Sequence, residues 1–211
     1  MHMAIPVVNL ADFLSGDPQL KQAFIQQLGT AYEEVGFVAV KNHGIPEDLI
    51  AAMYKKAQAF FSLPTEKKKQ YEIPGLAGQR GYTSFGKEHA KGSEAADLKE
   101  FYQHGQTIED GSADPEEFPD NVQIEEIDGF FETYNAAYRA FERSGKALLQ
   151  AIAVFLNLNE HFFDEHIHAG NSILRAIHYP PISQEPKSAI RAEQHEDINL
   201  ITFLVGASAA A

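Results

Sequence analysis

The residues with the clearest chemical meaning are an imidazole and a carboxylate two positions apart, in the string His195-Glu196-Asp197. Residues 198–205 follow, and their β-branched and aromatic composition predicts a strand. Side chains alternate in an extended segment, so His195 and Asp197 would share a face, with Cα atoms about 6.6–7 Å apart. Such a pair predicts two ligands of one metal ion. A further His would complete the two-His, one-carboxylate set that leaves positions open for dioxygen chemistry on ferrous iron. Taken alone, a His-x-Asp string is more often a surface pair at the entrance of a strand.

A second concentration of polar side chains lies in residues 161–168, which hold three histidines and two acids. In a helix, His161 would share a face with Asp164 or Glu165, whereas in an extended segment His166 and His168 would share one. The His-Glu-x-x-His spacing of a zinc site is absent. We therefore interpret the segment as a polar connecting element, with zinc binding as the alternative. The other histidines are each predicted to be structural, namely His43, His89, His104 and His178.

Composition excludes several classes of protein. The 211 residues are 44% hydrophobic and 22% charged, which is typical of a globular chain. The formal charge of −13 disfavours a nucleic-acid partner, because phosphate backbones repel an acidic surface. No apolar run approaches the roughly 18 residues that cross a bilayer, so a membrane protein is not expected. The absence of cysteine excludes thiol catalysis and, together with the absence of a signal pattern, favours a cytoplasmic location.

The elements that must position these residues follow from periodicity and from breakers. Apolar residues at helical spacing predict a long amphipathic helix of about thirty residues from 127 to 155. The Lys67–Lys69 run is predicted to be a solvated helix face. Helices should dominate the first three quarters of the chain, with strands only near its C-terminus. The remaining expected elements are an extended segment at 5–10, a helix from 18 to 35, a buried strand at 37–40, a helix from 46, a loop with short extended pieces at 74–93, a surface loop at 109–120, and a strand at 173–179.

These pieces resemble the isopenicillin N synthase-like family of non-haem iron, 2-oxoglutarate-dependent dioxygenases. Several separated strings carry the likeness in the family's order. They are IPVVNL (5–10), GFVAVKNHGI (36–45), FFSLPTEK (60–67), RGYTSFG (80–86), DLKEFY (97–102), LRAIHYPP (174–181) and HEDINLIT (195–202).

The resemblance implies an α+β fold whose core is a double-stranded β-helix, or jelly roll, with a helical N-terminal region. It divides the chain into a helical dioxygenase region (1–120), a long helix with a connector (121–170), and the start of the iron and 2-oxoglutarate oxygenase β core (171–211). The implied reaction is oxidation of a small-molecule substrate by dioxygen. The implied cofactors are Fe(2+) and 2-oxoglutarate, with ascorbate as an optional reductant.

The resemblance also assigns residues. His195 and Asp197 match the first two iron ligands, and Tyr179 matches a tyrosine near the cosubstrate. Arg80 and Tyr82 fall in a segment that borders the substrate pocket in some members.

Two departures from the family pattern leave alternatives open. The plant-type Asn-Tyr-Tyr-Pro string is replaced by Ile177-His178-Tyr179-Pro180, so an asparagine that helps to hold the cosubstrate is missing. The family's third ligand, a downstream His, and its Arg-x-Ser anchor have no match after Asp197, and the β core is expected to be truncated in this chain. The alternatives are an isopenicillin N synthase-type oxidase that does not use 2-oxoglutarate and a non-catalytic binding module on the same fold.

Overall fold

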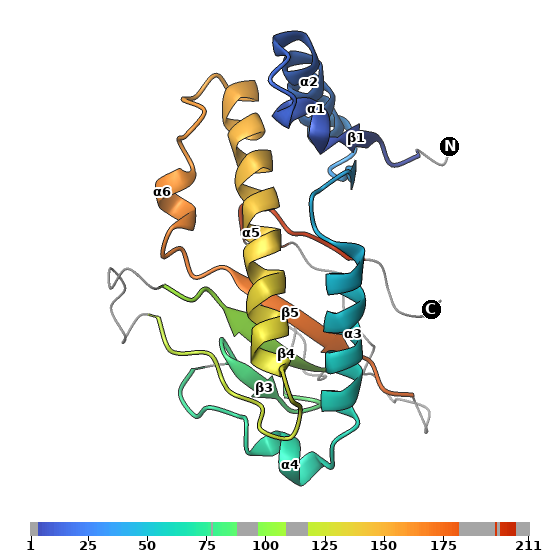
Figure 1. Ribbon diagram of the computed structural model, residues 1–211, viewed down its shortest axis with the longest axis vertical. Coiled ribbons are helices and arrows are strands. Elements are labelled where there is room, and N and C mark those ends of the chain that lie inside the picture. Colours follow the sequence, from blue (N-terminus) through green and yellow to red (C-terminus); the bar gives the residue numbers. More distant parts are fainter. Residues whose placement is uncertain are drawn as a thin grey trace. The chain divides into compact units, whose positions relative to one another are not determined.

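The computed structural model describes residues 4–76, 78–87, 97–108, 118–181, 197 and 199–205. Within them the chain forms two compact units, each assembled from separated segments (Figure 1). Unit 1 comprises residues 1–50, 106–118 and 132–172, and unit 2 comprises residues 51–105, 119–131 and 173–211. The sequential division at 120 and 170 stays a prediction. None of the described helices is both long enough and apolar enough to span a membrane.

Unit 1 is built from helices around a small parallel sheet. Strand β1 (Val7–Asn9) pairs with β2 (Ala39–Lys41) in the register Val8 opposite Val40. Asp17 accepts hydrogen bonds from the backbone N–H groups of Gln19 and Leu20, which caps α2 (Pro18–Glu34), and Gly36 lies at a φ of 77° just after that helix. Its elements are β1 (Val7–Asn9), α1 (Leu10–Leu14), α2 (Pro18–Glu34), β2 (Ala39–Lys41), the first turn of α3 (Glu47–Phe61), most of α5 (Phe130–Phe155) and α6 (Asp164–Ile167).

Several predicted elements of this unit are confirmed. The helix predicted from 18 to 35 is α2, and the long amphipathic helix is α5, which has 26 residues. The strand predicted at 37–40 forms as β2, but the expectation that it is buried is wrong. Phe37 is 60% exposed, and neither Ala39 nor Lys41 is covered. Because β1 is its one partner strand in the described part of the chain, the side chains of β2 are not enclosed between layers.

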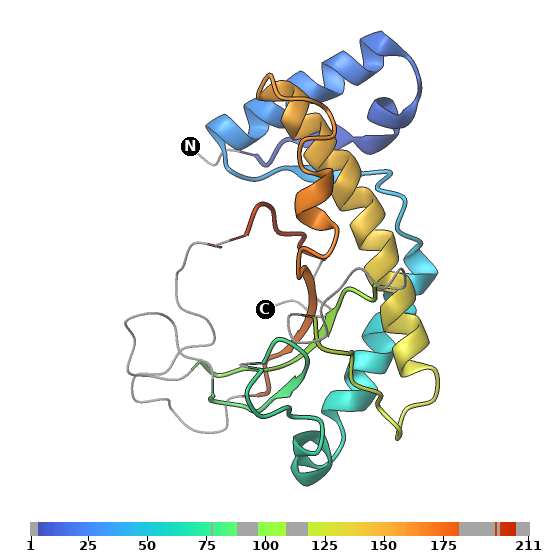
Figure 2. The same ribbon diagram turned by 90° about the vertical axis from the view of Figure 1, so that its left-hand side faces the viewer.

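Unit 2 is organised around an antiparallel sheet in the order β3 (Gly81–Thr83), β4 (Glu100–Gly105) and β5 (Ile173–His178), whose strands lie side by side in Figures 1 and 2. The aromatic ring of Phe60 packs edge-on against Tyr82 and Tyr102, at centroid distances of 5.7 and 5.4 Å, and also contacts Phe130. This aromatic cluster covers one face of the sheet. The elements of unit 2 are the rest of α3, α4 (Thr65–Lys69), β3 (Gly81–Thr83), β4 (Glu100–Gly105), the start of α5 and β5 (Ile173–His178).

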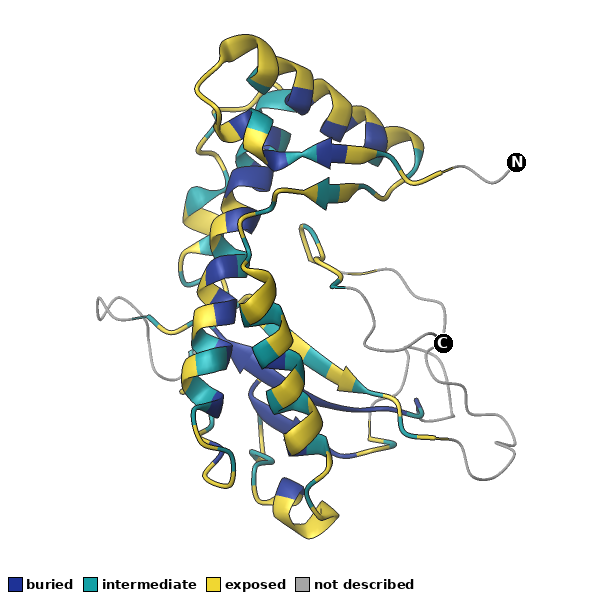
Figure 3. Ribbon diagram, turned by 45° about the vertical axis from the view of Figure 1, so that its right-hand side comes forward, coloured by how far each residue is buried: buried dark blue, intermediate teal, exposed yellow. Residues whose placement is uncertain are grey.

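The central strand β4 contradicts the expectation that strands occur only near the C-terminus. All six of its residues are buried, whereas exposure alternates along β5 (Figure 3). The predicted strand at 173–179 is confirmed as β5, which ends at His178. The strand predicted at 198–205 is wrong over the described residues 199–205, which are irregular. There the Asn199 amide donates to the Ile201 carbonyl and to Thr202, a local alternative to strand pairing that asparagine favours.

Candidate functional site

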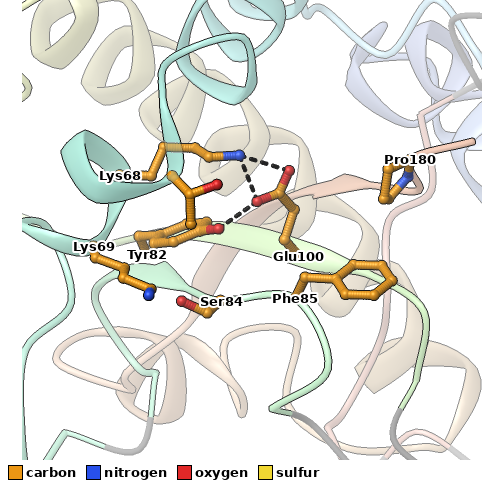
Figure 4. A pocket seen from close by; sticks show the side chains of 8 residues that line it. Lys68, Lys69, Tyr82, Ser84, Phe85, Glu100 and Pro180 are labelled. Atoms are coloured by element: carbon orange, nitrogen blue, oxygen red, sulfur yellow. Dashed lines mark hydrogen bonds and ion pairs between the residues drawn. The ribbon is translucent and has the colours of Figure 1, made fainter.

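A buried carboxylate gathers three polar partners in unit 2. Lys68 places Nζ 2.7 Å from Oε2 and 2.9 Å from Oε1 of Glu100, and the Tyr82 hydroxyl donates to Oε2. Nδ1 of His178 lies 2.7 Å from Oε1. Because an ionised carboxylate only accepts, Nδ1 carries the proton in this contact. We refer to Lys68, Tyr82, Glu100 and His178 as the Glu100 cluster; its lysine, tyrosine and glutamate converge in Figure 4.

Four elements supply the Glu100 cluster. Glu100 begins β4 and His178 ends β5, and the antiparallel register sets these two residues directly opposite each other. Lys68 comes from α4, and its Nζ also donates to the Phe61 carbonyl at the end of α3, 3.2 Å away. The prediction of a solvated Lys67–Lys69 face is therefore wrong for Lys68, which is only 6% exposed. A buried lysine needs a partner of opposite charge, and Glu100 is that partner.

Electrostatics keep this carboxylate ionised. Burial raises the pKa of Glu100, but hydrogen bonds from Lys68, Tyr82 and His178 outweigh burial, so the net pKa is lowered. The hydrogen bond between Tyr82 and Glu100 that lowers the pKa of the carboxyl group raises the pKa of the phenol. Burial first, and then the hydrogen bond to the Glu100 carboxylate, raise the pKa of Tyr82, so its hydroxyl stays protonated and donates.

An open hollow of about 400 Å³ lies beside the Glu100 cluster. Its wall is mixed, since the Phe85 ring and Pro180 are apolar and the Lys69 ammonium and the Ser84 hydroxyl are polar (Figure 4). Its lining residues are Thr65, Lys68, Lys69, Tyr82, Ser84, Phe85, Glu100 and Pro180.

The predicted substrate-side residues lie within unit 2. Tyr82 is 2% exposed and lines the hollow. Arg80 is fully buried and donates from Nη1 to the Gln79 carbonyl at 2.8 Å. A Cβ at Gly105 would lie 1.9 Å from Cζ of Arg80, so the glycine makes room for the guanidinium. The contribution of Arg80 and Tyr82 to substrate binding stays a prediction.

Tyr179 directly follows β5 and is 36% exposed. Exposure alternates along the strand, with Ile177 43% exposed and His178 in contact with Glu100, so Tyr179 continues the exposed face. Farther along the same face, Arg175 stacks over the Phe101 ring at 4.4 Å and donates to Gln103 at 2.5 Å. A phenol on this face is open to a ligand, as the predicted cosubstrate role requires.

Of the two predicted metal ligands, Asp197 is described and His195 lies outside the described residues. The Asp197 side chain is exposed, and its Oδ2 accepts a hydrogen bond from the Thr202 hydroxyl at 2.6 Å. Carboxylates that bind metals are commonly oriented by such an outer hydrogen bond. An accessible carboxylate held in this way, with an imidazole two residues before it in the sequence, suits ferrous iron in its donor chemistry.

The histidine-rich segment 161–168 shows no metal-binding arrangement. No group of three His, Cys, Asp or Glu side chains surrounds a common point in the described part of the chain, which includes this whole segment. His161 and Asp164 do share a face, at 3.1 Å, and Asp164 also binds Lys146 at 2.9 Å. These contacts support the interpretation of a polar connecting element.

Comparison with known proteins identifies the family. The family model described as the N-terminal region of non-haem dioxygenases in morphine synthesis matches residues 5–125, more than half of the chain. The chain belongs to the non-haem dioxygenase family. The resemblance seen in the sequence is thereby confirmed.

Similarity to named proteins extends over nearly the whole length of this non-haem dioxygenase chain. The proline hydroxylase buaE of Petromyces alliaceus is 32% identical and is matched over 96% of this chain and 64% of its own length. The 2-oxoglutarate-Fe(II) type oxidoreductase ppzD of Metarhizium rileyi is 28% identical over 95% of this chain and 59% of its own. The present chain thus spans about three fifths of the length of these relatives.

Solved structures show that this non-haem dioxygenase shares its fold with known oxygenases. A 2OG-Fe(II) oxygenase family protein of Caulobacter crescentus matches with a TM-score of 0.74 and 36% identity, over 86% of this chain and 58% of that one. A full-length Neurospora crassa protein, solved in complex with alpha-KG, matches with a TM-score of 0.75 and 28% identity, over 90% of this chain and 60% of the Neurospora chain. The α+β class predicted from the sequence is confirmed.

Proposed function

We propose that this protein is an iron(II)- and 2-oxoglutarate-dependent oxygenase that oxidises a small molecule with dioxygen. The observation that carries the proposal is the family match over residues 5–125, supported by relatives named as 2-oxoglutarate-dependent enzymes and aligned over 95–96% of the chain. The Neurospora crassa protein has also been solved with alpha-KG and thymine together, and another relative is named a proline hydroxylase. The formal charge of −13 disfavours a nucleic-acid partner, which also favours a small-molecule substrate.

The chain's own residues would divide the work as follows. His195 and Asp197 hold the iron, with Thr202 orienting the Asp197 carboxylate. When bound, iron and 2-oxoglutarate would supply the chemistry of dioxygen activation, with one oxygen atom passing to the substrate and the other to succinate as carbon dioxide is released. Tyr179 contacts the cosubstrate from the exposed face of β5, while Arg80 and Tyr82 border the substrate pocket. The third ligand expected from the family pattern is a histidine, and none follows Asp197 within these 211 residues.

We also propose that β3, β4 and β5 belong to the predicted double-stranded β-helix core. Two features support this placement. The sheet is antiparallel, and the aromatic cluster around Phe60 covers only one of its faces. On the other face β4 is buried, but along β5 the apolar side chains of Ile173 and Ile177 are about two fifths exposed in the described part of the chain, as expected of a strand that further strands would enclose.

The test is succinate release by the full-length protein supplied with Fe(2+), 2-oxoglutarate and ascorbate. Removing an outer partner of a metal ligand already costs roughly 10–100-fold in activity or metal affinity, so Asp197→Ala should reduce turnover by about a hundredfold or more. Asp128→Ala is the matched control, because Asp128 is also an exposed aspartate of unit 2 and is not a predicted ligand. Equal succinate release by the wild type and Asp197→Ala would reject the assignment of Asp197.

Two other outcomes separate the alternatives. Substrate oxidation without succinate release would favour an oxidase of the isopenicillin N synthase type. Failure of the full-length protein to bind Fe(2+) at micromolar concentration would favour a non-catalytic binding module.

A further inference from the structure

The last connection between β5 and the rest of unit 2 is made by a side chain. The β4–β5 register ends at the pair Glu100 and His178, and no ladder partner is described for Tyr179. Pro180 has no N–H to donate, so the backbone cannot continue the ladder there. His178 is instead held on two sides, because its Nδ1 lies 2.7 Å from Glu100 Oε1 and its ring stacks on Phe61 at 5.1 Å.

The Glu100 carboxylate, which accepts the hydrogen bond from His178, is itself held in place by other side chains. Lys68 contacts both carboxylate oxygens of Glu100 at 2.7 and 2.9 Å, and the Tyr82 hydroxyl donates to one of them. The lysine and glutamate side chains are 7% and 6% exposed, so solvent does not compete strongly for these contacts. A hydrogen bond to a buried, ionised and immobilised carboxylate is worth more than a neutral one. It therefore holds the end of β5 more firmly than the ladder alone.

We propose that Glu100 and His178 are positioning residues that fix Tyr179 for the binding of 2-oxoglutarate. Side chains alternate along the strand, so anchoring the half-buried His178, whose side chain is 38% exposed, on the Glu100 face sets the direction of Tyr179 on the opposite face. This inference rests on the proposed function, since it takes 2-oxoglutarate as the ligand of Tyr179.

Two substitutions at His178 separate the hydrogen bond from the packing. His178→Phe keeps a ring that stacks on Phe61 but removes the donor to Glu100. His178→Asn loses the ring but keeps an amide N–H where Nδ1 lies. The measurement is 2-oxoglutarate affinity by anaerobic calorimetry on the iron-loaded, full-length protein. We expect His178→Phe to bind about tenfold more weakly and His178→Asn to stay within about twofold of the wild type. Glu66→Gln, at an exposed ion pair on α4, is the matched control and should not change the affinity.

Hydrogen–deuterium exchange of a peptide covering residues 173–181 gives a readout that needs no cosubstrate. It should quicken in His178→Phe and remain near the wild-type rate in His178→Asn. The reverse order, with Asn weaker than Phe in both assays, would mean that stacking on Phe61 is what matters and would overturn the proposal. Unchanged affinity in His178→Phe would overturn it as well.

If His178→Phe does not fold, Glu100→Gln takes its place. It should lower 2-oxoglutarate affinity about tenfold, and an affinity equal to the wild type's would reject the positioning role. If the exchange results agree but the wild type itself does not bind 2-oxoglutarate, the proposed function fails while the anchoring of β5 stands.

Discussion

At the scale of single residues, His104 should make the stability of this protein depend on pH. Its side chain is fully buried on β4, edge-on to the Phe131 ring at 5.5 Å. Burial, and secondarily the positive charge of Arg80, lower the pKa of His104 from 6.5 to about 4. Between these two values the unfolded chain binds a proton that the folded chain does not. Stability is therefore complete above about pH 6.5 and is lost as the pH falls toward 4, by up to about 3 kcal/mol.

Urea unfolding between about pH 4 and about pH 7.5, a range that spans the predicted loss, is the check on His104. His104→Gln cannot titrate and should flatten the slope of unfolding free energy against pH, whatever its absolute stability. His166→Gln, an exposed histidine in α6, should leave the slope as in the wild type. A slope as steep in His104→Gln as in the wild type would contradict the prediction.

Single residues also show where sequence reasoning stops. The His-x-Asp string and Tyr179 can be picked out of the sequence because a residue type and a spacing suffice. The Glu100 cluster could not, because its contacting pairs are 18 to 78 positions apart and only the β4–β5 register and α4 bring them together. In the sequence, Lys68 lies between two other lysines, and no feature of the sequence distinguishes it from them. It is buried because Glu100 lies opposite it, not because of its neighbours.

At the scale of elements, the close approach of α2 to the end of α5 within unit 1 gives a prediction. A Cβ at Gly29 would lie 2.2–2.3 Å from three atoms of the Phe155 ring. Alanine normally gains about 1 kcal/mol over glycine inside a helix, but here it would overpack the contact. We expect Gly29→Ala to lose about 1–3 kcal/mol in urea unfolding. Thr30→Ala, on the exposed side of the same helix, should not lose stability.

A second variant makes the element-scale test specific. In Gly29→Ala combined with Phe155→Leu the smaller side chain relieves the clash, so the double variant should lose less than the sum of the two single variants. Strict additivity, or a Gly29→Ala protein more stable than the wild type, would show that the helices separate at no cost.

Elements with a periodic apolar pattern in their own sequence were predictable. Strands whose formation depends on pairing with other segments were not. Apolar spacing predicts both α2 and α5. In α2 the capping residue Asp17 adds to this signal, and in α5 the apolar face continues over a helix of 26 residues. Strand β4 lacks the alternation that marks a half-buried strand, because both of its faces are covered and even Gln103 and His104 are buried. Residues 199–205 have strand composition but adopt irregular structure, and composition alone does not make a strand.

At the scale of the whole molecule, the excess of 30 acidic over 17 basic residues predicts that added salt stabilises the fold. Like charges 10 Å apart in water repel by about 0.4 kcal/mol, and folding brings many of them to that range. Raising NaCl from about 10 to about 100 mM shortens the screening length from about 30 to about 10 Å. We expect the urea midpoint to rise by the equivalent of about 1 kcal/mol.

Salt also weakens the attraction within ion pairs, which opposes this stabilisation. The structure indicates that this loss is smaller than the gain from screened repulsion. Exposed pairs such as Lys69–Glu66 are worth about 0–1 kcal/mol each, while the buried Lys68–Glu100 pair is little screened. Sucrose at equal osmolality is the control, because it changes water activity without screening charge and should shift the midpoint less than NaCl. A midpoint that falls with NaCl would mean that attraction within the ion pairs outweighs the repulsion set by the charge of −13.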